Sequence, residues 1–160
     1  MPFNHPTFTT LIALTKTYEI SGKFEQEGNA QSLLYAPPAK PVTFRRTMRY
    51  VFDYEGGESA VDAFVLNVLV DPISQEDHHD GQPLWKGTAF ILDYGMKRGA
   101  LDLEKETILN YYRKLATPGF KLKSLSLRTR IYVFGEDADP AIFVRDIVNP
   151  AIQNSEVIRA

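Results

Sequence analysis

Cysteine is absent from this chain of 160 residues, and histidine occurs only three times. The lack of cysteine excludes disulfides, thiolate nucleophiles and cysteine-ligated zinc. The sequence also lacks a Gly-x-Ser-x-Gly nucleophile turn, a Walker lysine and the full dinucleotide-binding glycine pattern. These absences favour a non-catalytic protein that works without a cofactor.

The chain also has little excess of either charge, because 18 basic residues oppose 20 acidic ones and the net charge is −2. Such a chain has no general field that draws it to nucleic acid or to a membrane. No apolar run approaches the roughly 20 residues that span a bilayer, and no basic region precedes the short apolar stretch at 11–14. We therefore expect no membrane partner, and a cytoplasmic protein or a particle assembled in the cytoplasm.

The composition is that of a globular domain, with 44% hydrophobic and 24% charged residues. Its first part is rich in strand-forming residues and ends in a connector that contains Pro37, Pro38 and Pro41. The sequence therefore predicts an N-terminal hairpin or arm over 1–41, followed by a single α+β core domain over 42–160.

Hydrophobic periodicity predicts the elements of the core domain. Apolar residues alternate with polar ones between 42 and 54, which indicates a half-buried strand, and further strands are predicted at 85–94 and 120–134. Helical spacing occurs at about 59–70, 102–116 and 141–148, each time before a proline. Residues 75–82 read as a polar loop. The expected architecture is α+β, a mainly antiparallel sheet with two to three amphipathic helices packed on one face.

A strand and the helix after it in the first half of the chain resemble a strand and helix near its end. RTMRYVF at 46–52 matches RTRIYVF at 128–134 at five of seven positions, and AFVLNVLVDP at 63–72 aligns with AIFVRDIVNP at 141–150. One interpretation is an internal duplication of a strand–helix unit with pseudo-twofold symmetry. The other is that tyrosine, valine and phenylalanine are simply common strand formers.

A candidate metal site lies in the acidic loop. Glu76, His78, His79 and Asp80 combine imidazole and carboxylate groups, which together bind zinc, manganese or iron. Adjacent histidines seldom chelate one ion, however, and the third histidine is His5, far away in the sequence. The alternative interpretation is a solvated loop.

A second candidate site is basic. Arg45, Arg49, Arg128 and Arg130 occur on two predicted strands that also carry aromatic residues. A sheet with stacking aromatic rings and flanking cations binds single-stranded nucleic acid. Alternatively, the rings belong to the core and the arginines to a solvated face.

The end of the last predicted helix, IVNPAI at 147–152, resembles the helix end of the small subunit of formylglycinamidine ribonucleotide synthase. This resemblance implies a small α+β accessory subunit of a purine-pathway amidotransferase complex. It covers only one short stretch of the chain.

Three functional hypotheses follow from the sequence. The first is a non-catalytic structural protein, a subunit of a homo-oligomer or of a virus-like (phage) particle, joined through its N-terminal arm or a sheet edge because exposed strand edges tend to be paired or covered. The second is a module that binds single-stranded nucleic acid. The third is the small accessory subunit of a metabolic enzyme complex that the resemblance implies.

Overall fold

A computed structural model describes residues 12–159 of the chain. Its strands are all paired in antiparallel fashion within one seven-stranded sheet, in the order β4-β1-β3-β6-β5-β7 with β2 also paired to β3. The strands are β1 Leu14–Gly22, β2 Gly28–Asn29, β3 Thr43–Gly56, β4 Gln75–His78, β5 Phe90–Met96, β6 Phe120–Phe134 and β7 Gln153–Ile158. The helices are α1 Glu58–Val68, α2 Leu103–Arg113, α3 Pro140–Ile147 and the short 3-10 helix η1 Ala30–Leu33. The predicted α+β fold with a mainly antiparallel sheet is confirmed.

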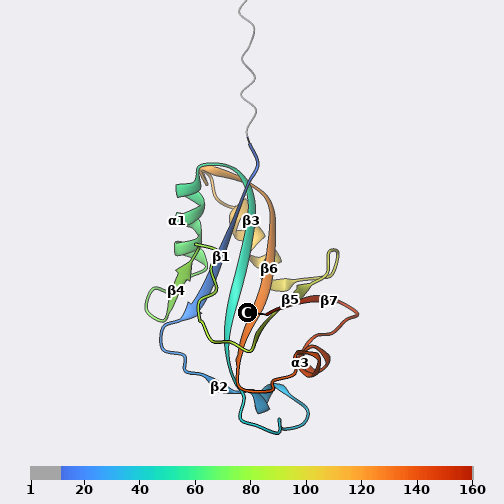
Figure 1. The fold of residues 1–160 in the computed structure, drawn as a ribbon. Coiled ribbons are helices and arrows are strands. Elements are labelled where there is room, and N and C mark those ends of the chain that lie inside the picture. The colour runs from blue at the N-terminus through green and yellow to red at the C-terminus, as the bar shows by residue number, and fades with distance from the viewer. Residues whose placement is uncertain (1–11, 160) are drawn as a thin grey trace, which may run out of the picture.

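The long strands β3 and β6 pair along the centre of the sheet (Figure 1). Because successive side chains of a strand point to opposite faces, the two faces differ in chemistry. Tyr50 and Phe52 of β3 and Leu125 of β6 are buried on the face that carries the helices, here called the helix face. Arg49 of β3 and Arg130 of β6 lie on the opposite face, here called the loop face.

Two apolar clusters fill the helix face, one at each end of the sheet. Helices α1 and α2 cover the first, in which Phe64 contacts the rings of Phe52, Tyr112 and Phe120. Helix α3 and η1 cover the second, where Phe143 packs against Phe90. All three α-helices therefore lie on one face, as the sequence predicted.

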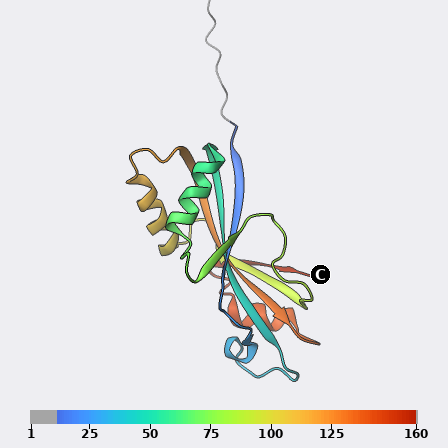
Figure 2. The ribbon, with the colours of Figure 1, turned by 90° about the vertical axis from the view of Figure 1, so that its left-hand side faces the viewer.

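The chain between β4 and β5 crosses the loop face, on the side of the sheet away from α1 and α2 (Figure 2). Trp85 from this segment packs edge-on against Tyr132, with ring centroids 4.8 Å apart. The backbone N–H of Leu84 donates to the Tyr132 hydroxyl over 3.3 Å. This segment therefore shields part of the loop face from water, and several polar side chains of that face are buried beneath it.

Strand β1 belongs to the main sheet. It pairs with β3 from Leu14 opposite Tyr54 to Ile20 opposite Met48, and its Tyr18 and Ile20 side chains are buried in the first cluster. The first part of the predicted arm, 1–11, lies outside the described residues. The boundary between arm and core at residue 41 stays a prediction.

The sheet consists of two halves with the same topology. Strands β1, β3 and β4 with α1 form one half, and β5, β6 and β7 with α3 form the other, so that the strand order reads the same from either edge inward. The helix ends are alike in detail. Gln75 N–H donates to the Asp71 carbonyl and Gln153 N–H to the Asn149 carbonyl, each over 2.8 Å, and both glutamine side chains accept a hydrogen bond in return.

Strand pairing shows how the two halves correspond. Gln75 and Gln153 are counterparts. Gln75 lies opposite Gly22 in the first half, and Gln153 lies opposite Met96 in the second, so Gly22 and Met96 are counterparts as well. Counting back along β1 and β5 then makes Glu19 the counterpart of Asp93. Their opposite neighbours, Arg49 and Arg130, are counterparts as well.

The strand part of the sequence alignment is therefore wrong by one residue. It matched Tyr50 with Tyr132, but Tyr50 is buried among the helices whereas Tyr132 lies on the loop face against Trp85. A shift of one residue places a side chain on the other face. The topology is repeated, and a duplication as its origin stays a prediction.

Two element predictions differ from the structure. Residues 75–78 form the edge strand β4, where we predicted a polar loop, and the strand predicted from 85 begins only at Phe90. Strand β4 lies at the sheet edge and buries little of either face, so that it has no apolar alternation to detect. Residues 85–89 belong to the chain over the loop face, where Trp85 packs on the sheet instead of lying in it.

Gly95 lies where β5 bends away from β6. A Cβ atom at this position would be 2.7 Å from the carbonyl oxygen of Leu127. We expect Gly95→Ala to lower the free energy of unfolding by about 1–3 kcal/mol, because the backbone must shift to relieve the overlap. Gly57→Ala is the control, since its Cβ would make an ordinary 3.7 Å contact and the change should cost only the roughly 0.5 kcal/mol of a poorer N-cap for α1. Equal stability of the two variants in urea titrations would contradict this expectation.

None of the helices described between residues 12 and 159 is long and apolar enough to cross a membrane.

Candidate functional site

The loop face carries a buried group of charged side chains at the middle of the sheet, here called the central cluster, namely Glu19, Arg49, Asp93, Arg128 and Arg130. Glu19 is 5% exposed, Asp93 2% and Arg130 9%. Charges with so little access to water persist only when they are paired and hydrogen-bonded. The cluster combines three guanidinium groups with two carboxylates.

Asp93 is the hub of the central cluster. Its carboxylate accepts hydrogen bonds from Arg49 Nη1 over 2.8 Å, from Arg130 Nε over 3.0 Å and from Arg128 Nε. Burial alone raises the pKa of a carboxyl group, but the hydrogen bonds from the three arginines outweigh it and hold the pKa of Asp93 below its usual value. Asp93 is therefore ionised at neutral pH.

Glu19 joins the cluster from β1. Its Oε1 atom accepts hydrogen bonds from Thr47 Oγ1 over 2.5 Å and from the Tyr132 hydroxyl over 2.7 Å, while Oε2 lies 3.9 Å from Arg130 Nη1. Burial, together with the hydrogen bond to Glu19, raises the pKa of Tyr132 to about 12. Tyr132 therefore stays protonated and serves as a donor.

The central cluster joins the two halves of the molecule. Glu19 and Asp93 are counterparts, as are Arg49 and Arg130, and Arg49 of the first half donates to Asp93 of the second. On the helix face, Thr129 Oγ1 of the second half donates to Met48 Sδ of the first over 3.4 Å. The charges thus bridge the strand pair β3–β6, on which the fold depends.

The space at the central cluster is too small for a substrate. A cavity of about 20 Å³ lies between Arg49, Arg130, Gln82 and Asp80. Such a volume admits one water molecule. The arrangement therefore explains structural cohesion better than it explains catalysis.

The structure brings together three of the four arginines predicted to contact nucleic acid. Arg49, Arg128 and Arg130 converge on Asp93. Arg45 lies apart, with its guanidinium carbon 4.7 Å from the centroid of the Trp85 ring. Contact of these residues with nucleic acid stays a prediction.

The residues predicted to bind metal do not converge. His78 Nε2 lies 3.1 Å from Ser21 Oγ and 3.8 Å from Glu76, whereas His79 Nδ1 lies 3.2 Å from Asp77. Adjacent residues of extended chain point to opposite faces, and the His79 ring packs against Tyr18. Asp80 accepts a hydrogen bond from the Gln82 N–H. In the part of the chain that the structure describes, no group of three or more acidic or histidine side chains is placed to hold a metal ion.

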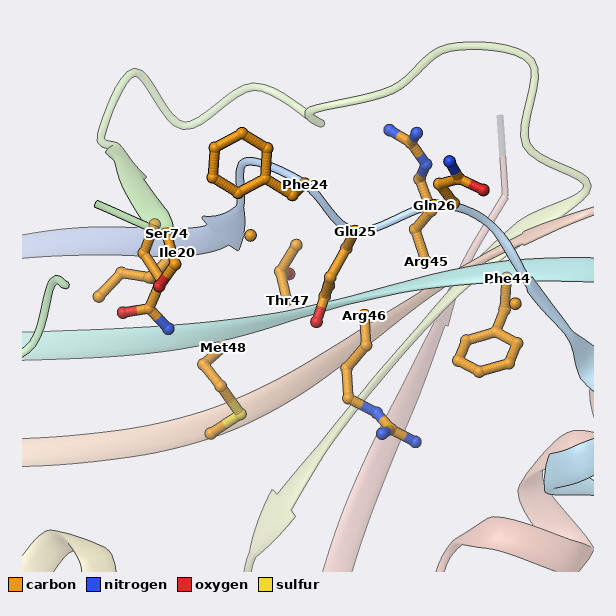
Figure 3. Close-up of a pocket in the computed structure, with 13 residues that line it drawn as sticks. Ile20, Phe24, Glu25, Gln26, Phe44, Arg45, Arg46, Thr47, Met48 and Ser74 are labelled. Atoms are coloured by element: carbon orange, nitrogen blue, oxygen red, sulfur yellow. The ribbon is translucent and has the colours of Figure 1, made fainter. Parts of the chain in front are cut away.

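A groove of about 600 Å³ opens where the sheet is interrupted beside β3 (Figure 3). Strand β1 pairs with β3 only as far as Met48, and β2 pairs with Phe44 and Thr43, so residues 45–47 have no partner strand on this side within the described chain. The loop 23–27 spans the gap. Phe24, Arg45 and Arg46 line the groove, and Phe24 is 76% exposed.

A counterpart groove of about 530 Å³ lies beside β6 in the other half. Strand β5 pairs with β6 only from Thr129 to Val133, which leaves 120–128 without a partner strand on that side in the described structure. Lys97, Arg98 and Lys105 line this groove together with Ser124 and Arg128. None of its described lining residues is aromatic, in contrast to the groove at Phe24.

Sequence reasoning missed both carboxylates of the central cluster. Glu19 stands in KTYEISG and Asp93 in FILDYG, where each is the single acid among strand-forming residues. A lone charge in such a run is a signal of a buried, paired group, because an unpaired one would be too costly. Phe24 belongs to the first part of the chain, whose strand-forming composition gave no sign that this residue lies in an exposed loop.

Comparisons with known proteins give no family: no family model matches the chain, and neither a curated protein nor a solved structure matches it.

Proposed function

We propose that the protein is a non-catalytic subunit of a homo-oligomer and that copies join through the outer edge of β7. The single observation that carries the proposal is that β7 is a six-residue outer strand with one charged side chain, Glu156. Natural proteins usually protect such edges with charge or cover them, since an open edge pairs with another chain.

The opposite edge strand provides the contrast. Strand β4 holds Glu76, Asp77 and His78 within four residues, and Asp80 follows closely. Strand β7 holds one charged residue, Glu156, with Arg159 directly after it, and Ile152 next to it is 42% exposed. Pairing with β7 of a second copy covers the outward backbone groups of this strand and the exposed Ile152 beside it.

The backbone of β7 favours an antiparallel pair centred on Ser155. Lys97 N–H donates to the Ile152 carbonyl over 2.7 Å, so Asn154 and Glu156 also direct their backbone groups toward β5, and Ser155 directs its groups outward. In the centred register Glu156 lies opposite Asn154 of the second copy, which avoids repulsion between two glutamates. Such a dimer is also a building block for a larger particle.

Ser155→Pro tests the proposal. Proline removes only the outward N–H and leaves the β5 ladder intact. We expect the wild-type protein to form dimers in size-exclusion chromatography with light scattering, and the variant to dissociate with a constant roughly tenfold higher or more, because hydrogen bonds across the interface are lost.

Asp77→Pro is the matched control. Lys23 N–H donates to the Ser74 carbonyl over 2.8 Å, which makes Asp77 the outward residue of β4 and the counterpart of Ser155. This variant should remain dimeric. A wild-type protein that stays monomeric at every concentration, or equal dissociation in both variants, would refute the proposal.

A further inference from the structure

We infer that the groove at Phe24 binds single-stranded nucleic acid, with a base stacked on Phe24 and phosphates held by Arg45 and Arg46. This inference is independent of the β7 interface. Of the four arginines that the sequence predicted as contacts, the proposed site keeps only Arg45. It adds Arg46 and residues of the loop 23–27.

Phe24 supplies an exposed stacking surface on a loop whose two ends are held in place. The loop that carries it is fixed at one end by Lys23, whose N–H donates to the Ser74 carbonyl over 2.8 Å and whose Nζ donates to the Pro72 carbonyl over 2.9 Å. At the other end, Glu27 accepts a hydrogen bond from Thr43 over 2.8 Å. An exposed aromatic ring can stack on any base, because every base has a π-face.

Two guanidinium groups flank the gap from opposite faces of the sheet. Figure 3 shows Arg45 on the same side of β3 as Phe24 and Arg46 on the other. The Nε atom of Arg45 is buried and has no hydrogen-bond partner among the described residues. Arg46 is exposed and stacks near Phe44, 5.7 Å from the ring centroid. Neither guanidinium belongs to an ion pair in the described part of the chain, so the charge of each is not neutralised and can attract phosphate oxygens. The Arg45 guanidinium also lies over the Trp85 ring, 4.7 Å from its centroid.

The chemistry of the groove favours a nucleic acid over an acidic peptide. Cations and an open strand edge are sufficient to bind an acidic peptide. The counterpart groove at Lys97 and Arg98 has both of these, and no aromatic residue lines it in the described structure. Of these two grooves, as lined by residues 12–159, the groove at Phe24 combines an exposed ring with its arginines. The amide groups of Gln26 and Gln75 line it too and are suited to the edges of a base.

Among the residues that the structure describes, Glu25 is the one acid that lines the groove, and it stands between Phe24 and Gln26. Its carboxylate repels a phosphate chain. Glu25→Gln removes this charge while it keeps the shape of the side chain. We therefore expect this variant to bind an oligonucleotide more tightly than the wild type does.

The test uses a fluorescein-labelled oligothymidylate of about eight nucleotides, which is within the site size of common single-strand binders. Fluorescence anisotropy should show salt-dependent binding by the wild-type protein. Phe24→Ala should raise the dissociation constant roughly 5- to 150-fold, the range that corresponds to loss of one base–aromatic stack. Arg46→Ala should lower the slope of log affinity against log salt by about 0.7, which corresponds to one phosphate contact.

Two exposed residues outside the groove provide controls. Tyr35 is 83% exposed and Arg98 lines the counterpart groove. Tyr35→Ala and Arg98→Ala should bind as the wild type does. Circular dichroism confirms that each variant is folded, which is expected because Phe24 and Arg46 are exposed.

Three outcomes would overturn the inference. One is the absence of salt-dependent binding by the wild type, another is equal binding by the Phe24→Ala and Tyr35→Ala variants, and the third is binding of labelled polyglutamate in place of the oligonucleotide. The oligomeric state of each variant is measured in parallel. Failure of the β7 interface is therefore distinguishable from failure of this site.

Discussion

The Asp93→Ala variant is expected to lose about 3–5 kcal/mol of unfolding free energy, because three arginines lose their shared carboxylate and the buried Arg130 keeps only the more distant Glu19. Arg49, Arg128 and Arg130 all donate to Asp93, and Asp93 is only 2% exposed. Urea titration followed by circular dichroism measures the change. Asp53→Ala is the control, since Asp53 lies on the same face but accepts its hydrogen bonds from the Thr15 and Ser124 hydroxyls. This control should cost less, about 1–2 kcal/mol, because the two hydroxyl donors to the Asp53 carboxylate are exposed and can turn to water when it is removed.

The stabilisation from Asp93 should also depend on pH. Its pKa is lower in the folded protein than in the unfolded chain, where aspartate titrates near about 3.9. The contribution is therefore complete above the unfolded pKa and declines as the pH falls through the lower folded value. The stability difference between wild type and Asp93→Ala should be constant at neutral pH and should narrow below about pH 4. A loss smaller than about 1 kcal/mol at neutral pH would show that the cluster is not a buried ion network.

Phe64→Ala is expected to have a comparable effect on the helix face, about 3–5 kcal/mol in urea titrations. Phe64 is 5% exposed, and its ring centroid lies 6.2 Å from Phe52, 6.1 Å from Tyr112 and 5.7 Å from Phe120. Removal of the ring leaves a cavity between α1, α2 and the sheet.

Leu66→Ala in the same helix is the matched control. Leu66 is 51% exposed, and its replacement gives the same helix-forming residue without a cavity. We expect it to change the stability by less than about 0.5 kcal/mol. Similar losses in both variants would mean that α1 contributes through helix formation alone, not through packing.

The sequence predicted those parts of the fold in which side-chain burial follows a regular period. The alternation through Tyr50 and Phe52 placed β3 correctly, and the stripe at Val61, Phe64 and Val65 placed α1 against it. The side-chain pattern did not predict strand β4, because its pairing with β1 is made by backbone N–H and C=O groups, which do not depend on the side chain. Strand order was also beyond reach, since contacts between distant segments leave no local pattern.

The candidate sites were predicted less well, and the reasons are physical. Arg49 and Arg130 were both predicted as contacts with nucleic acid, but their shared partner Asp93 lies in another strand. His78 and His79 are adjacent in sequence, yet they have different partners because extended chain alternates. The exposed Phe24 resembled a core residue, since composition does not record which side of a loop a ring occupies.

The pairing of β3 with β6 has a consequence for biosynthesis. Thr43 finds its partner in Phe134, so most of the chain must leave the ribosome before the middle of the sheet closes. Until then the nascent first half presents an unfilled edge along β3. A neighbouring nascent chain carries the same Phe120–Phe134 segment and fits that edge equally well. Closure of the sheet within one chain is therefore a late step of its synthesis, and the edge along β3 stays open to other segments until then.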